Sequence, residues 1–181
     1  MTTYNTGSDA ANTAVRAFLT KVGEHYLGRT FDTGSGKGKQ DWERIRENVF
    51  ENKCAYCENG NTKLQIEHLI MFNREEFGLH HPGNVVPVCK SCNKRKKQDG
   101  KYVTWEEQLK LICNGSQSKA LFSKRRNKIL GHIKDECYPV LSKEESHSIR
   151  VVAEGLYEHI KNQVGDSLKL YKDLDQAFVK K

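Results

Sequence analysis

Four of the six cysteines stand in two C-x-x-C pairs, Cys54 with Cys57 and Cys89 with Cys92. Such a pair lets two thiolates reach one ion from a tight turn, and two pairs supply the four-sulfur shell that structural zinc prefers. Redox pairs and an iron–sulfur cluster are competing interpretations, but neither pair has the strand-to-helix setting of a thioredoxin-like motif. We therefore expect these four cysteines to hold a structural zinc ion.

A carboxylate–histidine pair, Glu67-His68, lies between the cysteine pairs, and Asn93 directly follows the second one. Hydrolysis of a phosphodiester needs an activated water, charge neutralisation on the phosphate and help for the departing oxygen. A histidine and a hard divalent cation supply all three. His68 is the candidate general base because imidazole titrates near neutral pH. Glu67 and Asn93 offer oxygen ligands that suit Mg²⁺ or Mn²⁺.

In this order the residues resemble the HNH endonuclease family, whose signature is an acidic–His pair, a central Asn and a terminal His or Asn. Glu67-His68, Asn84 and Asn93 match that signature within residues 54–97, about a quarter of the chain. The resemblance implies that His68 activates water and that Asn84 orients His68 and its loop. It implies that Glu67 and Asn93 hold the catalytic ion. It further implies DNA cleavage to 5′-phosphate and 3′-hydroxyl ends, in a role such as restriction or phage defence.

Two positions depart from the commonest family pattern. Glu67 stands where Asp is frequent, and Asn93 where the last His is frequent. Both keep an oxygen or nitrogen donor, so we expect activity and leave the preferred metal open. Successive side chains on a regular strand point to opposite faces, so the strand must end or twist at Glu67-His68 for both to address one phosphate. The zinc ion would fix the start of a helix that presents Asn93.

A second pair of histidines, His80 and His81, precedes Pro82-Gly83 in the same loop. Adjacent histidines beside such a turn are more often exposed than catalytic. We therefore expect exposed turn residues, with a direct role in the site as the less favoured alternative.

Basic residues cluster immediately after the second cysteine pair, on the expected helix. A solvated helix face is the ordinary explanation of such a run. Its place beside a phosphate-directed site favours contacts with the DNA backbone, which carry affinity without sequence information. The predicted DNA-binding residues are Lys90, Lys94, Arg95, Lys96 and Lys97; Lys124, Arg125, Arg126 and Lys128 form a second cluster that could extend the footprint.

Composition limits the class of protein. The 181 residues suffice for one ordinary domain with an appendage, and a net charge of +7 suits a polyanionic partner. No apolar run approaches the ~20 residues of a membrane span, and the N-terminus lacks the layout of a secretion signal. We expect a cytoplasmic protein without membrane contact.

Periodicity predicts the elements that position these residues. Helices are expected at 9–27, from 41 towards the first cysteine pair, after Cys92, at 105–113, at 121–133, from a capping box at Ser142, and after a cap at Asp166. Strands are expected at 64–70 and 84–88. The segment 34–39, GSGKGK, has the composition of a flexible linker.

Together these elements predict an α+β fold that is mostly α. Its centre is a ββα-metal module with the four-cysteine zinc site, flanked by N- and C-terminal helices. The expected divisions are residues 1–40, an N-terminal helix and linker; 41–100, the nuclease module; and 101–181, a helical region. The helical flanks are candidate surfaces for a homodimer or a partner protein.

Two other functions compete with a DNA endonuclease. The same cysteines and basic residues suit a non-catalytic zinc-containing module that binds nucleic acid. The helical C-terminal region could instead be the main functional surface, recruiting the protein to a partner. RNA is an alternative substrate.

Overall fold

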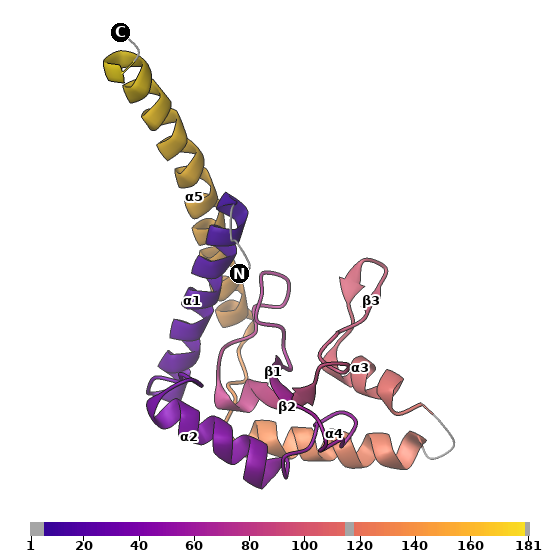
Figure 1. The fold of residues 1–181 in the computed structure, drawn as a ribbon. Coiled ribbons are helices and arrows are strands. Elements are labelled where there is room, and N and C mark those ends of the chain that lie inside the picture. Colours follow the sequence, from indigo (N-terminus) through magenta and orange to yellow (C-terminus); the bar gives the residue numbers. More distant parts are fainter. Residues whose placement is uncertain (1–5, 115–117, 180–181) are drawn as a thin grey trace.

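The protein combines a helical majority with two small two-stranded sheets, as a computed structural model that describes residues 6–114 and 118–179 shows (Figure 1). This confirms the expected α+β, mostly α, fold class. Within the described segments, no helix is long and apolar enough to cross a membrane.

Two long helices, α1 (Gly7–Leu27) and α5 (Lys143–Leu174), pack side by side in opposite directions (Figure 1). Capping boxes begin both, Thr6 with Asp9 and Ser142 with Glu145, because each pair satisfies amide groups that the first turn leaves free. Their apolar faces share one hydrophobic core, to which Ala11, Val15, Leu19, Ile149, Ala153 and Tyr157 belong. The first and last expected divisions of the chain are therefore packed together.

Strands β1 (Leu64–His68) and β2 (Val85–Cys89) form an antiparallel pair. In its register Glu67 is paired with Val86, and His68 is paired with Val85. All of β2 is buried. Both expected strands are confirmed, although β1 ends at His68, two residues earlier than predicted. A 3₁₀ turn, Pro82–Asn84, leads into β2.

The glycine–lysine segment is not a linker, contrary to our prediction. Helix α2 (Gly36–Arg44) begins inside it and continues as a π-helical turn, Ile45–Val49. Gly38 lies so close to the backbone that a Cβ there would be 2.4 Å from the Asp32 nitrogen. Gly38 therefore serves close packing, whereas Gly36 has nothing within 4 Å and is favoured by its positive φ of 55°.

The helix predicted directly after Cys92 is also absent. The chain turns and forms a hairpin of β3 (Lys97–Gln98) and β4 (Lys101–Tyr102), and helix α3 (Trp105–Ile112) begins only after it. Asp99 and Gly100 both have positive φ, 51° and 79°, as a two-residue hairpin turn requires.

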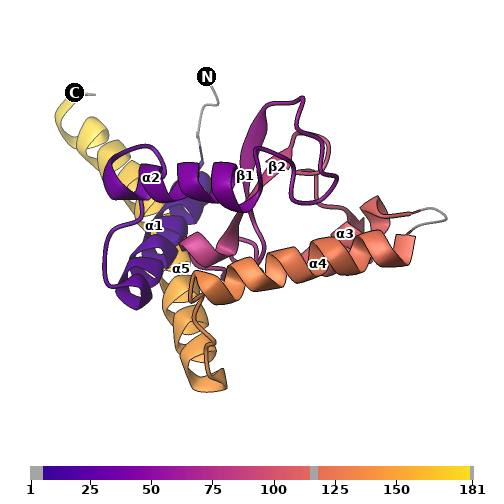
Figure 2. The same ribbon diagram turned by 90° about the horizontal axis from the view of Figure 1, so that it is seen from below.

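Helix α4 (Ser118–Asp135) lies along the sheet (Figures 1 and 2), where a ring nitrogen of His132 is 3.0 Å from the Val85 carbonyl oxygen. Its Ile129 belongs to the core that also contains β2 and Trp42 of α2. The predicted cap at Asp166 is wrong, because α5 runs unbroken past it to Leu174 and ends in a π-helical turn, Asp175–Val179.

Residues 69–81, between the two strands, join the two cores. Leu69 is buried in the core around the sheet, whereas Phe77 and Leu79 are buried in the core between α1 and α5. Helix α1 contacts this segment backbone to backbone: a Cβ added to Gly23 would lie 2.3 Å from the His80 carbonyl oxygen. The long helices thus determine where the loop after β1 lies.

We expect Gly23→Ala to destabilise the protein by ~1–3 kcal/mol, because the added methyl overlaps a backbone atom that cannot rotate away. Chemical denaturation measures the change. Gly155→Ala in α5 is the matched control, since a Cβ there meets nothing within 4 Å and a helical Ala is favoured over Gly. Equal stability of the two variants would contradict this account of the α1 packing.

Candidate active site and metal centre

The four cysteines of the two C-x-x-C pairs converge. Their sulfur atoms all lie within 4.8 Å of one another, and three of the four residues are buried. The Cys57 and Cys89 sulfurs are 3.7 Å apart, close to the ~3.8 Å that a tetrahedral shell with ~2.3 Å zinc–sulfur bonds requires. The group can therefore hold a metal ion, and the donor set fits zinc.

Backbone hydrogen bonds position the two cysteine turns. The Ala55 amide donates to the Pro87 carbonyl oxygen of β2 at 2.8 Å, which ties the first turn to the strand that ends at Cys89. Burial raises the pKa of Cys54 to about 11. Burial also opposes ionisation of Cys89, but hydrogen bonds from Ser91 and the Cys92 backbone lower its pKa to about 6. Metal binding must therefore displace protons from the more buried thiols.

Helix α4 holds the first cysteine turn through Arg125. Its guanidinium donates to the Tyr56 carbonyl oxygen at 2.9 Å, pairs with Glu58 at 3.1 Å and approaches the buried Cys113 sulfur at 3.4 Å. The rest of the second basic cluster is likewise paired with glutamates, Lys124 with Glu58, Arg126 with Glu106 and Lys128 with Glu51. These cations join elements of the fold, and the extension of the DNA-binding surface by this cluster stays a prediction.

Glu67 and His68 border one open pocket of about 430 Å³, although they are neighbours on a strand. Neighbouring side chains on a regular strand point to opposite faces. Glu67 and His68 can border the same pocket because β1 ends at His68. Arg16 of α1 and Tyr102 of β4 line other parts of the same pocket. The pocket therefore collects residues from elements far apart in the sequence.

The His68 ring is held between two aromatic neighbours. Its Nε2 lies 3.0 Å from Nδ1 of His80, so one nitrogen donates and the other accepts. The ring also stacks on Phe72, with centroids 4.8 Å apart. Burial, reinforced by His80 and by the charges of Arg16 and Arg95, lowers the pKa of His68 to about 3. The ring is therefore neutral at neutral pH, and the same burial makes it a weaker proton acceptor than a solvated imidazole.

His80 and His81 are not exposed turn residues, contrary to our prediction. His81 is 1% exposed, and its Nδ1 accepts a hydrogen bond from the Gly83 amide at 3.1 Å. His80 packs on Phe31 and contacts His68. The burial arises because the loop folds back between α1 and the sheet.

Arg95 occupies a different position from the one predicted. Its side chain is 3% exposed and points inward, where it pairs with Glu67 at 2.5 Å and donates to the His68 carbonyl oxygen at 2.8 Å. Burial raises the pKa of Glu67 against the opposing effect of this ion pair. Arg95 is therefore enclosed by the end of β1 and is not a surface contact for DNA.

Asn93 lies on the same face of β1 as Glu67. Its amide nitrogen donates to the Gln65 side chain at 3.0 Å, and Gln65 and Glu67 point to the same face because they are two residues apart. Within residues 6–114 and 118–179, only the four cysteines form a metal-binding group of three or more His, Cys, Asp or Glu side chains. A catalytic cation beside Glu67 would thus need Asn93 and water as further ligands.

Asn84 fixes the loop that follows His68. The side chain is 1% exposed; its oxygen accepts from the Ile70 amide at 2.8 Å. Its amide nitrogen donates to the carbonyl oxygens of Ile70 and Leu79, at 2.9 and 2.8 Å. The Asn84 backbone oxygen accepts from the Leu69 amide. One buried residue therefore joins both ends of the loop and places His80 beside His68.

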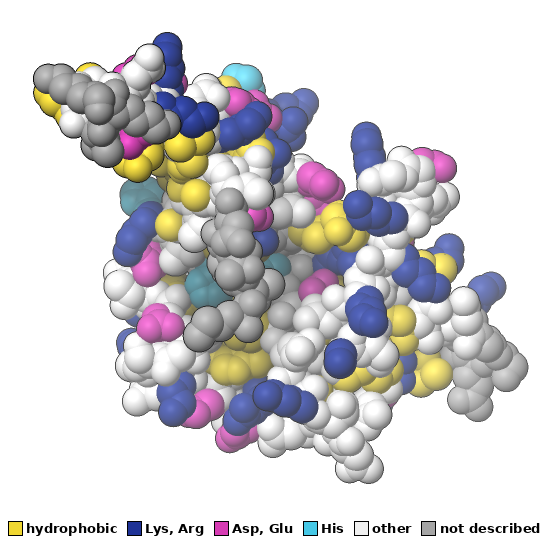
Figure 3. Space-filling model, turned by 45° about the horizontal axis from the view of Figure 1, so that its top comes forward, with side chains coloured by type: hydrophobic (Ala, Val, Ile, Leu, Met, Phe, Trp, Pro, Cys, Tyr) yellow, Lys and Arg dark blue, Asp and Glu magenta, His cyan; other side chains and the backbone are white. Residues whose placement is uncertain are grey.

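The remaining basic residues lie on the surface. Lys90, Lys94, Lys96 and Lys97 are all exposed, and the Lys97 ammonium lies 4.4 Å from the Tyr102 ring centroid. Within the described part of the chain, none of the four pairs with a carboxylate. Lysine and arginine side chains are visible around the β3 end of the molecule, on the right of Figure 3. These lysines are available to an anionic partner.

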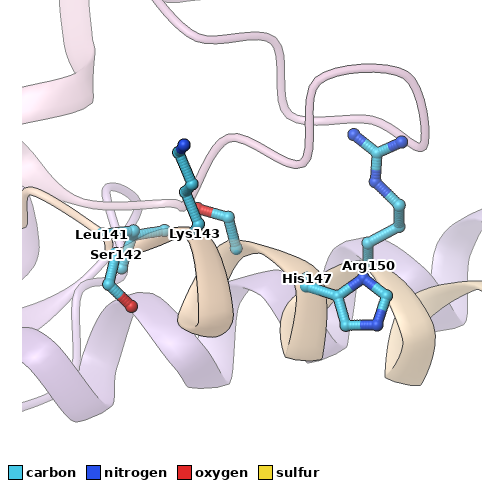
Figure 4. A pocket seen from close by; sticks show the side chains of 6 residues that line it. Leu141, Ser142, Lys143, His147 and Arg150 are labelled. Carbon is cyan, nitrogen blue, oxygen red and sulfur yellow. The ribbon is translucent and has the colours of Figure 1, made fainter.

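A second hollow, of about 360 Å³, lies where α5 begins (Figure 4). Leu141, Lys143, His147 and Arg150 line it, and none of the predicted site residues lies there. The predicted catalytic pair Glu67 and His68 therefore lies in the pocket at the end of β1 and not in this hollow.

The chain finds no counterpart in three comparisons: no family model, no curated protein and no solved structure matches it. The resemblance to the HNH endonucleases thus rests on the residues that carry it. Motif reasoning missed Arg16, which lines the pocket, and gave His80 a direct role only as the less favoured alternative. Helix α1 and the loop bring these residues to His68 only through tertiary packing, which leaves no local sequence signal.

We expect one equivalent of metal, zinc by its donor set, in the purified protein, and none in Cys54→Ser. Because binding free energy of a structural metal contributes to folding, the variant should melt at least ~10 °C lower. Elemental analysis and thermal denaturation measure both. Cys137→Ser, at an exposed cysteine, is the control and should retain metal and stability. Full metal content in Cys54→Ser would show that the four sulfurs are not the binding group.

Proposed function

We propose that the protein is a metal-dependent DNA endonuclease of the HNH type. The observation that carries the proposal is the placement of His68, a neutral imidazole at the end of β1, in a pocket that Glu67 also borders. Asn84 fixes the loop beyond it, which is the role that the family resemblance implies for this residue. The pocket and the motif therefore support the same chemistry, whereas the helix that a ββα-metal module would place directly after Cys92 is replaced by a turn and the β3–β4 hairpin.

The chain's own residues can perform the proton transfer and hold the phosphate. His68 takes a proton from the attacking water, while its contacts with His80 and Phe72 hold the ring in one orientation. Arg16 lines the same pocket from α1 and supplies a positive charge for a phosphate oxygen. We expect the products to carry 5′-phosphate and 3′-hydroxyl ends.

Glu67 and Asn93 would hold the catalytic cation, Mg²⁺ or Mn²⁺. Glu67 Oε1 is bound by Arg95, so the carboxylate would offer its other oxygen, and Asn93 would offer its amide oxygen because its nitrogen donates to Gln65. The cation, when bound, supplies Lewis-acid stabilisation of the phosphate and the leaving oxygen. The donor set is hard and fits these ions.

We also propose that zinc occupies the four-cysteine group as a structural ion. Cys89 ends β2, and Cys92 immediately precedes Asn93. The backbone amide of Asn93 donates to the Cys89 carbonyl oxygen at 3.0 Å. A metal there would fix the turn that carries Asn93 relative to the strand that pairs with Glu67. The zinc would therefore preorganise the site without taking part in the reaction.

The Glu67–Arg95 ion pair favours one alternative, a non-catalytic zinc-containing module that binds nucleic acid. A guanidinium that already neutralises the carboxylate weakens its attraction for a divalent cation. In that case the lysines around the second cysteine turn would carry the whole function. The two proposals differ in whether cleavage occurs.

We expect His68→Ala to reduce plasmid nicking in Mg²⁺ or Mn²⁺ by ~100-fold or more, because the variant lacks the group that accepts the proton from water. His159→Ala, at an exposed histidine on α5, is the matched control and should cleave at the wild-type rate. EDTA should abolish cleavage, and added divalent cation should restore it.

Two outcomes of that assay contradict the proposal in different ways. Wild-type cleavage by His68→Ala would exclude His68 as the base. Salt-dependent DNA binding by the wild type, with no metal-dependent cleavage, would support the binding module instead.

We expect the double variant Lys94→Ala/Lys96→Ala to bind DNA more weakly and to lower the slope of log affinity against log salt by ~2, about 0.9 for each phosphate that a lysine no longer neutralises. Fluorescence anisotropy at several salt concentrations measures the slope. Lys124→Ala/Lys128→Ala is the control, because those lysines are paired with Glu58 and Glu51. An equal decrease in both variants would mean that only net charge matters.

A further inference from the structure

Helix α5 carries an apolar stripe along its length, of which α1 covers only the first half. Ile149, Ala153 and Tyr157 are buried against α1. At 100° per residue, exposed Leu170 points about 100° away from the direction of Ala153, whereas four other exposed apolar residues further along α5 lie within about 60° of it. These exposed residues are Val164, Leu168, Tyr171 and Leu174.

Helix α1 covers the apolar stripe of α5 only as far as its own first residue. A Cβ added to Gly7, the first residue of α1, would lie 3.4 Å from Val164 Cβ, so the two helices part at that level. Beyond it α5 projects from the body of the protein (Figure 1), and Leu168 and Tyr171 are 54% and 64% exposed. Hydrophobic side chains are visible on this projecting end at the upper left of Figure 3.

A projecting amphipathic helix of this kind needs a partner. Most helical stability in water comes from packing of the apolar face, and an isolated helix of this length is marginal. The outer half of α5 has the same stripe as the inner half. A second helix laid along it would bury Leu168, Tyr171 and Leu174 as α1 buries Ala153.

We propose that the outer half of α5 pairs with the same segment of a second copy, antiparallel, about a two-fold axis at Tyr171. The apolar residues of the stripe, from Val164 on α5 to Phe178 in the π-helical turn that follows it, are spaced four, three, three and four apart, a pattern that reads the same in both directions; Leu170 lies outside the stripe. Reversal therefore sets Val164 opposite Phe178, Leu168 opposite Leu174, and Tyr171 opposite itself. A two-fold interface requires this self-complementarity.

The packing of α1 on α5 already shows the geometry that such a partner would adopt. Helix α1 runs opposite to α5, from Gly7 beside Val164 to Tyr26, whose hydroxyl donates to Glu145 at 3.0 Å. The partner's α5 would run in the same direction as α1. It would continue the line of α1 along the same stripe, so the new interface would extend an existing one.

The charges of the segment fit a second copy better than a polyanion or a lipid surface. Residues 161–179 contain three lysines and three aspartates and are neutral, in a chain of net charge +7. Two neutral segments do not repel each other. Helices that bind anionic membranes have polar faces rich in Lys and Arg, which this balanced segment lacks.

The test is the mass of the full chain in solution, independent of any catalysis. Analytical ultracentrifugation should give twice the chain mass of 20.7 kDa for the wild type and the chain mass itself for Leu168→Asp/Tyr171→Asp. We expect the dissociation constant to rise at least ~100-fold, because two charges would be buried per copy. Both residues are exposed in the single chain, so circular dichroism and melting should confirm a folded monomer.

Val151→Asp is the matched control, since Val151 is exposed on α5 about 160° from Tyr171. It should remain dimeric. A wild type that is still monomeric at ~100 µM overturns the proposal, because a stable two-fold interface forms well below that concentration. A dimer that Leu168→Asp/Tyr171→Asp leaves intact also overturns it, since the interface would lie elsewhere.

Cysteine cross-linking tests the orientation, in metal-loaded Cys137→Ser protein so that the exposed native thiol does not react. Antiparallel pairing predicts that Val164→Cys joins Phe178→Cys when the two proteins are mixed. Cross-links only between identical Val164→Cys chains would show a parallel pair and overturn the proposed arrangement.

Discussion

The buried amide of Asn84 is the interaction on which the rest of the candidate site depends. Three hydrogen bonds from this one side chain join Ile70 to Leu79 and so close the loop between the strands. Closure brings His80 back to His68 across twelve positions of sequence. It also carries Phe77 and Leu79 into the core between α1 and α5. The loop therefore connects the pocket to the core between the long helices.

The metal centre and the ion pairs around it both hold the other side of the site. Sulfur ligands from two turns can share one ion, whereas Arg125 reaches the first turn from a helix nearly seventy residues further along. On the opposite edge, Arg95 is enclosed by Glu67 and the carbonyl oxygens at the end of β1. Basic residues here thus have two separate uses: buried guanidinium groups join elements, and exposed lysines remain available to a partner.

Local patterns were sufficient for much of the fold but not for its long-range contacts. Periodicity predicted α1, α3, α5 and both strands of the central pair, and spacing predicted the cysteine group. The Asp99-Gly100 turn was overlooked although this dipeptide is a strong hairpin signal. By contrast, the inward direction of Arg95 and the place of His80 follow from tertiary packing. Neither charge nor composition distinguishes a buried cation from a solvated one, or a tightly packed glycine from a flexible one.

The pairing of α1 with α5 has a consequence for the order of assembly during synthesis. Ala11, Val15 and Leu19 emerge from the ribosome long before Ile149, Ala153 and Tyr157, which later cover them. The cysteine turns and the central strands can meet earlier, because their ligands span fewer than forty residues. The loop beside His68, whose Phe77 and Leu79 belong to the later core, is enclosed only when α5 docks. Synthesis from the N-terminus thus allows the metal centre to form before the loop beside the pocket is enclosed.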